Sequence, residues 1–209
     1  MKKTRILVVL AVFLFSVVGC KTKDTGKMIS LDKDKETKSE EQQVQGTTKI
    51  AITIQNQGTI EAELDANVAP ITVNNFVSLV KKGFYDGLTF HRVINGFMMQ
   101  GGDPKGNGTG GSDKTIKGEF ANNGVPNSLS HVRGVLSMAR SNDKNGASSQ
   151  FFIMHQDSTY LDGDYAAFGK VTSGMEIVDK ICQNTPVQDN NGTVQPADQP
   201  KIESIKIIK

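Results

Sequence analysis

The sequence predicts a mainly β domain in which short antiparallel strands close into a barrel and two helices pack against it. Three observations predict this fold. Short runs of alternating apolar and polar residues recur from residue 50 onward, Asn-Gly pairs separate many of them, and apolar residues take helical spacing in two places. Closure of the sheet would leave no strand edge exposed.

The domain opens with a predicted β-hairpin. Apolar residues occupy every second position over residues 50–54, and the same alternation returns over residues 60–64. Asn56-Gln57-Gly58 lies between the two runs and has the residue types of a hairpin turn.

Two helices are predicted. The first begins at Pro70, since proline suits a first helical turn, and ends at Gly83. We expect it to cover one end of the sheet with Val73, Phe76, Val77 and Val80. The second begins at Ser173, where Glu176 completes a capping box, and buries Ile177, Val178 and Ile181.

Short strands separated by turn residues make up most of the rest. The predicted strands are Leu88–Ile94, Phe97–Gly101, Val135–Ala139, Gln150–His155, Ala166–Val171 and Ile202–Ile208. The Asn-Gly pairs, whose glycines suit a positive φ, fall at residues 95–96, 107–108, 123–124, 145–146 and 191–192.

The first 20 residues differ sharply from the rest of the chain. A basic start precedes an apolar run from Ile6 to Val18, which is shorter than the roughly 20 residues of a membrane span and suits a secretory signal peptide. Gly19-Cys20 at its end resembles a bacterial lipobox, although Val17 stands where leucine is usual. This resemblance implies removal of residues 1–19 and lipidation of Cys20; an uncleaved anchor and a plain signal peptide are the alternatives.

Residues 20–47 are predicted to be a flexible, charged tether, because mixed charge without apolar periodicity cannot offset the entropy of ordering. A long exposed helix is the alternative. The folded domain would then take residues 48–209.

Charge excludes one class of partner. Loss of the signal peptide would leave 21 Lys and Arg against 22 Asp and Glu, so the formal net charge would change from +2 to −1. Without a clustered basic face, no nucleic-acid partner is expected.

With Cys20 acylated, Cys182 has no partner for an intramolecular disulfide and is predicted to be a small buried hydrophobe. We expect a monomer.

Arg92 is the residue of greatest interest. It lies in an alternating strand, so Leu88, Phe90 and Ile94 should share its face. A guanidinium among apolar neighbours is costly to desolvate and should be paired or used. An edge-strand arginine that reaches water or a carboxylate is the alternative.

Several blocks resemble the cyclophilin family of peptidyl-prolyl cis/trans isomerases. They are FHRVINGFMMQGG (residues 90–102), GVLSMARSNDKNGASSQFFIM (residues 134–154), Tyr85-Asp86-Gly87, Leu161-Asp162-Gly163 and Phe168-Gly169. They lie in the family's order and extend from about Lys49 to the C-terminus. The resemblance implies an eight-stranded barrel with a helix at each end, and isomerase activity on proline-containing polypeptides.

The resemblance also assigns roles in the site. Arg92 is the catalytic donor to the proline nitrogen, and Gln100 helps to hold it and the substrate. The slot for the proline ring is formed by Phe97, Met98, Phe152 and Leu161, with Gln150 at its edge. The strip that meets the residues before proline is Ala139, Arg140 and Ser141. For the aromatic and methionine residues taken alone, plain barrel core is the alternative.

Three positions depart from the common family pattern. Tyr160 stands where tryptophan is usual and Tyr165 where histidine is usual, and tyrosine keeps an apolar wall with a polar tip. Arg140 replaces a common asparagine and adds a positive charge near the residues before proline.

Other chemistries fit less well. The glycine-rich run 106–111 does not open a helix after a strand, as a phosphate loop would. His91, His131 and His155 lack metal-ligand spacing, and no Gly-x-Ser-x-Gly elbow marks a hydrolase. We expect neither a metal nor a cofactor.

The function predicted from the sequence is a lipid-anchored isomerase that assists the folding of exported proteins on the outer side of the cell membrane. A module that only holds proline-bearing segments, and a surface protein that uses the domain as a scaffold, are the alternatives.

Overall fold

The structure is a computed structural model, and it describes residues 43–209. The predicted signal peptide, Cys20 and most of the predicted tether lie outside the described residues. Within residues 43–209, no helix is both long enough and apolar enough to cross a membrane.

Eight antiparallel strands form one curled sheet in the order β3-β4-β6-β5-β7-β2-β1-β8. Their bounds are β1 Thr47–Ile54, β2 Gly58–Asp65, β3 Phe90–Ile94, β4 Met98–Gly101, β5 Val135–Met138, β6 Phe151–Met154, β7 Ala167–Ser173 and β8 Ile202–Ile208. The two edge strands meet where Thr89 forms a bridge with Lys201. The predicted mainly β fold with eight antiparallel strands is therefore confirmed, and the edges meet through a short contact instead of a full ladder.

That closing contact explains why β3 is shorter than predicted. The Leu88 carbonyl accepts a hydrogen bond from the Ile202 N–H at 2.8 Å, and the Phe90 N–H donates to the Pro200 carbonyl at 2.9 Å. Leu88 and Thr89 therefore pair with the segment around the start of β8, and β3 itself begins at Phe90.

The opening hairpin is confirmed. β1 and β2 pair along their whole length, with Ile52 opposite Ile60. The turn between them places both Asn56 (φ 60°) and Gly58 (φ 121°) at positive φ, which asparagine and glycine adopt at least cost.

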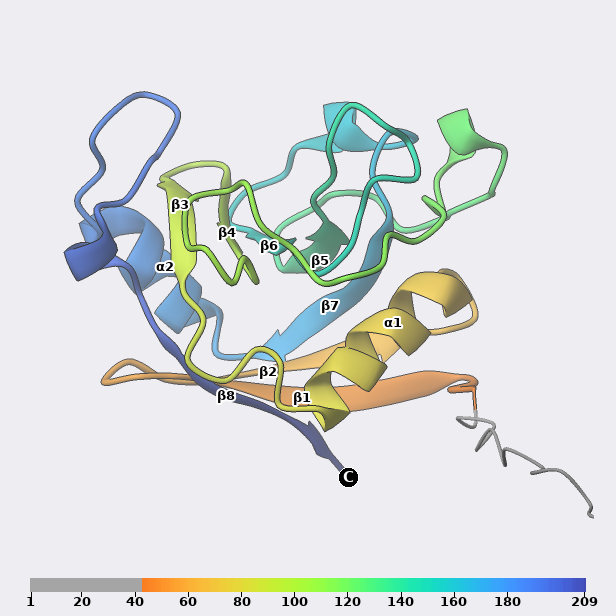
Figure 1. Cartoon of the computed structure of the whole chain (residues 1–209), viewed down its shortest axis with the longest axis horizontal. Helices are drawn as coiled ribbons and strands as arrows, with labels where there is room; N and C mark the ends of the chain where they lie inside the picture. The colour runs from red at the N-terminus through yellow and green to blue at the C-terminus, as the bar shows by residue number, and fades with distance from the viewer. Residues whose placement is uncertain (1–42) are drawn as a thin grey trace, which may run out of the picture. The chain divides into compact units, whose positions relative to one another are not determined.

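The first helix, α1 (Pro70–Lys81), begins with proline in its first turn, as predicted. The backbone N–H groups of its first turn bond to a residue that is distant in sequence. The carboxylate of Glu119 accepts hydrogen bonds from the Ile71 N–H at 3.0 Å and from the Thr72 N–H at 2.8 Å. The helix then packs against β8 and β2 (Figure 1).

The second helix, α2 (Met175–Asn184), corrects one prediction. Ser173 is the last residue of β7, and the N-cap is Gly174 at φ 87° with no side-chain cap. The capping box is absent because Ser173 remains paired with Glu61 of β2, and a left-handed glycine makes the turn from strand to helix. The buried face is confirmed, and it includes Cys182, whose thiol pKa burial raises to about 12.

Two apolar clusters lie within the domain. The main core contains a group of packed rings, in which Phe76 stacks on Tyr85 and meets Phe151 edge-on. The second, smaller cluster is built on Met98, Val135, Phe152, Met154 and Ala167. Figure 1 shows α1 and α2 on opposite sides of the curled sheet, with long loops gathered beyond β3 to β6. The site lies over the second cluster.

Candidate active site

A cavity of about 590 Å³ lies over the second cluster and forms an open groove. Nine of the twelve site residues predicted from the sequence line it: Arg92, Phe97, Met98, Gln100, Ala139, Arg140, Phe152, Leu161 and Tyr165. Ser141 and Gln150 line a second cavity of about 270 Å³, which shares Gln100, Ala139 and Arg140 with the groove. Tyr160 lines neither; it is 72% exposed and stacks beside Phe97 at 6.2 Å between ring centroids.

Arg92 faces the groove because β3 contains an irregularity. Phe90 pairs with Gly101, but the next pair is Arg92 with Gln100, so the register shifts between them. A bulge of this kind re-aims side chains. Phe90 is fully buried in the main core whereas Arg92 lines the groove, so the prediction that the two share a face is wrong.

Three hydrogen bonds hold the Arg92 guanidinium. Its Nε donates to the Asn191 carbonyl at 2.8 Å, its Nη2 to Asn191 Oδ1 at 3.1 Å and its Nη1 to Gln100 Oε1 at 3.3 Å. Burial lowers the pKa of Arg92, while Tyr165 and Asp189 act in the opposite direction. Arginine is nevertheless charged at any ordinary pH, so the groove carries a fixed cation.

Gln100 connects the two cavities. It accepts from Arg92 through Oε1 and donates from Nε2 to Gln150 Oε1 at 2.9 Å. Gln150 in turn donates to the carbonyls of Gly108 and Gly110, at 3.1 and 2.8 Å. The expected holding contact between Gln100 and Arg92 is present, and the chain of amides also fixes the glycine-rich loop beside the groove.

The apolar side of the groove is built on the second cluster. Met98 and Phe152 belong to that cluster, and Phe97, Leu161 and Tyr165 pack against it. The rings of Phe152 and Tyr165 meet edge-on at 6.0 Å. These side chains therefore belong to or pack against the apolar cluster and also line the groove, where they leave a hollow next to Arg92.

Ten of the residues that line the groove were not predicted from the sequence, and Asn191 and His91 are the two most closely tied to Arg92. The sequence predicts only that Asn191 belongs to an Asn-Gly turn, because its contact with Arg92 spans 99 positions of sequence. His91 is 5% exposed and lines the groove, and neither ring nitrogen has a hydrogen-bond partner within the described residues. Burial lowers the pKa of His91, and the neighbouring Arg92 charge adds to this effect while Asp103 opposes it. No local pattern in the sequence identified either residue.

A hydrogen-bonded Ser-His-Asp chain lies beneath the groove. His131 Nδ1 is 2.7 Å from Asp162 Oδ1, and His131 Nε2 is 2.9 Å from Ser137 Oγ. Ser137 is fully buried and lines neither cavity, so its hydroxyl cannot reach a substrate. In residues 43–209, no three His, Cys, Asp or Glu side chains are placed to hold a metal ion.

The curled sheet carries an open groove in which the Arg92 guanidinium lies beside an apolar hollow, an arrangement suited to binding through shape and hydrogen bonding. Comparison with known proteins makes the class specific. Residues 49–207 match the family model described as cyclophilin type peptidyl-prolyl cis-trans isomerase/CLD. The chain is 49% identical over 135 residues to a peptidyl-prolyl cis-trans isomerase of Helicobacter pylori, a match that covers 64% of this chain and 80% of that protein.

Other relatives agree. Over 117 residues the chain is 54% identical to peptidyl-prolyl cis-trans isomerase B of Bacillus subtilis, covering 56% of this chain and 78% of that protein. The crystal structure of a cyclophilin type isomerase from Cryptosporidium parvum matches with a TM-score of 0.69 and 32% identity, over 78% of this chain and 98% of that one. The chain belongs to the cyclophilin family, and it is a peptidyl-prolyl cis-trans isomerase.

Proposed function

We propose that this cyclophilin is held by a lipid on Cys20 at the outer face of the cell membrane, where it speeds prolyl isomerisation in exported proteins. The observation that supports this location is the basic start, apolar run and Gly19-Cys20 boundary within the first 20 residues. Residues 20–47 would act as the tether between the lipid and the isomerase domain.

The groove performs the reaction through Arg92. Rotation about a peptide bond faces a barrier of about 18–20 kcal/mol because resonance stiffens the C–N bond. At the twisted transition state this resonance is lost, and the proline nitrogen regains a lone pair that can accept a hydrogen bond. A fixed guanidinium that donates to this nitrogen binds the transition state better than the planar ground state, which is what catalysis requires.

The arrangement of the groove supports these roles. Asn191 and Gln100 hold Arg92 without neutralising it, and the hollow beside it is bordered by Phe97, Met98 and Phe152. A second crystal structure of the Cryptosporidium isomerase, obtained in the presence of the dipeptide Ala-Pro, matches this chain with a TM-score of 0.68. In the present protein an X–Pro unit would place its ring in this hollow and its nitrogen toward Arg92.

The membrane location is tested by expressing the full chain in a bacterium that processes lipoproteins. We expect mass spectrometry to find a mature N-terminus at Cys20 that carries acyl chains, and membrane fractions to contain the isomerase activity. The Cys20→Ala variant should lose the acyl mass and leave the membrane fraction. An unmodified Cys20, or equal membrane retention of both proteins, would contradict the anchor while leaving the isomerase activity untouched.

A further inference from the structure

Arg140 lies on the wall between the two cavities of the site. Together with Gln100, Gly108 and Ala139, it lines both the groove of about 590 Å³ and the second cavity of about 270 Å³. The second cavity is otherwise bordered by uncharged residues, among them Ser141, Ser148 and Gln150. Arg140 is therefore accessible to a substrate from both sides.

Neutral groups fix the Arg140 guanidinium in place. Its Nε donates to the Asp164 carbonyl at 3.0 Å and its Nη1 to the Ser141 carbonyl at 2.9 Å. The guanidinium carbon lies 4.8 Å from the ring centroid of Tyr165 and 5.2 Å from that of Phe120. Backbone carbonyls and ring faces orient a cation without supplying a compensating negative charge.

In the part of the chain that the structure describes, no carboxylate lines either cavity to balance this charge. Their charged lining residues are Arg92 and Arg140, and no Asp, Glu or Lys from residues 43–209 borders either cavity. Neither arginine takes part in an ion pair within the described residues. The site thus has two fixed positive charges and no internal acid.

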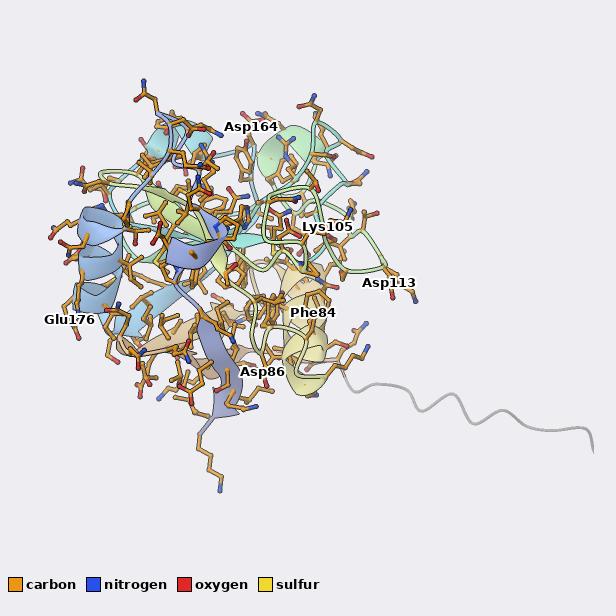
Figure 2. All side chains as sticks on the ribbon, turned by 60° about the vertical axis from the view of Figure 1, so that its left-hand side comes forward. Phe84, Asp86, Lys105, Asp113, Asp164 and Glu176 are labelled. Atoms are coloured by element: carbon orange, nitrogen blue, oxygen red, sulfur yellow. The ribbon has the colours of Figure 1, made fainter. Side chains whose placement is uncertain are left out.

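Two carboxylates lie near the arginines of the site, and each bonds to a neutral partner instead of forming an ion pair with an arginine. Asp164 accepts a hydrogen bond from Asn122 Nδ2 at 2.9 Å, and Asp189 accepts from the Thr193 hydroxyl at 2.9 Å. Figure 2 shows Asp164 among the loops in the upper part of the view, far from Asp86 beside β8 and Glu176 on α2. No carboxylate within the described residues forms an ion pair with Arg140, so an acidic group that pairs with it would come with the substrate.

We propose that Arg140 makes this enzyme favour prolyl segments that carry Asp or Glu one or two residues before the proline, with the acidic side chain entering the second cavity. The inference rests on the isomerase function and on the placement of the proline ring beside Arg92. From that hollow, Ala139, Arg140 and Ser141 lead along the groove wall to the second cavity. A peptide that runs along this strip brings the residues before proline to the guanidinium.

The first test is kcat/KM for proline peptides with Glu, Gln, Lys or Ala at each of the two positions before proline. A partly exposed ion pair contributes up to about 1 kcal/mol, so we expect Glu to exceed Gln by about threefold to fivefold and Lys to be the poorest. Raising the salt from about 0.01 M to about 1 M shortens the Debye length from about 30 Å to about 3 Å and should remove most of this preference.

The second test uses Arg140→Gln and measures the ratio of kcat/KM for Glu and Gln peptides, which cancels any general loss of activity. The ratio should fall to about 1, whereas Arg140→Glu should favour the Lys peptide. Lys170→Gln is the matched control: it also removes one positive charge, from an exposed residue of β7 that lines neither cavity, and it should keep the wild-type ratio.

The outcomes separate this inference from the proposed function. If the wild type accelerates isomerisation of the Ala peptide but treats Glu, Gln and Lys alike, the acidic preference is wrong and the isomerase function stands. If the preference survives in Arg140→Gln, Arg140 is not its source and the inference fails. If no peptide is isomerised faster than in buffer, the proposed function fails as well.

Discussion

The groove around Arg92 and the Ser137-His131-Asp162 chain share one aromatic residue, Phe152. Phe152 lines the groove, and the ring of His131 stacks on it at 6.0 Å between centroids. The buried chain has the shorter hydrogen bonds, 2.7 and 2.9 Å, whereas Arg92 meets Gln100 at 3.3 Å. Judged by bond geometry alone, the buried chain would look like the catalytic centre.

The two regions differ in role because only the groove is accessible to substrate and only the groove presents a fixed charge to it. Ser137 and His131 are fully buried, so their hydrogen bonds satisfy groups that would otherwise be costly inside the domain. Partial burial acts to raise the pKa of Asp162, but hydrogen bonds from Ser130 and His131 outweigh it and leave this pKa below its ordinary value. Arg92 instead presents a fixed charge to an open cavity. The comparison teaches that a tight polar network can be structural while a looser one supports chemistry.

The largest effect should come from Arg92→Ala. Removal of the donor to the developing lone pair should lower kcat/KM about 100-fold or more, as the loss of one transition-state donor does, in an assay of prolyl peptide isomerisation. The thermal midpoint should change little, because Arg92 bonds to groove and loop groups and not to the core. A variant whose kcat/KM lay within threefold of the wild type would refute the role of Arg92.

A smaller effect, and one on stability, is expected from Ser137→Ala. The buried His131 Nε2 would lose its partner, which should lower the free energy of unfolding by about 1–3 kcal/mol in urea titrations. Isomerase activity should stay within twofold of the wild type. Ser112→Ala, which removes an exposed hydrogen bond from a serine hydroxyl to the Lys114 carbonyl, is the matched control and should change the free energy of unfolding by less than about 0.5 kcal/mol. A large loss of isomerisation in Ser137→Ala would place the buried chain in the catalytic machinery after all.

The smallest effect is a pH dependence of stability that isomerase activity should not share. Burial lowers the pKa of both His91 and His131 from the ordinary 6.5. As the pH falls below about 6.5, the unfolded chain therefore takes up protons first. The free energy of unfolding should be fully retained above that pH and decrease below it, by at most about 1.4 kcal/mol per pH unit for each histidine.

Urea midpoints between about pH 7 and about pH 5 measure this loss. Over the same range kcat/KM should stay nearly constant while the protein remains folded, because Arg92 keeps its proton. A midpoint that rises on acidification would show that the histidines gain favourable interactions when protonated, and it would contradict the burial argument.

Local patterns were enough for much of the fold. The alternation in residues 50–54 and 60–64 predicted the hairpin, and Pro70 predicted the start of α1. Eleven of the twelve site residues predicted from the family blocks border the two cavities, because these residues lie in short contiguous motifs. The capping box at Ser173 failed because strand pairing with Glu61 competed for the same residue, which local propensity does not take into account.

The sequence by itself determined the strand alternation, the helices' apolar faces and the groove residues that lie in contiguous motifs, since each depends on neighbours within a few positions. Tertiary structure alone decided the register shift that turns Arg92 away from the face of Phe90, the Glu119 carboxylate at the start of α1 and the contact of Asn191 with Arg92. The last two join residues 47 and 99 positions apart. Contacts of this range arise only when the barrel closes, because no short segment contains both partners.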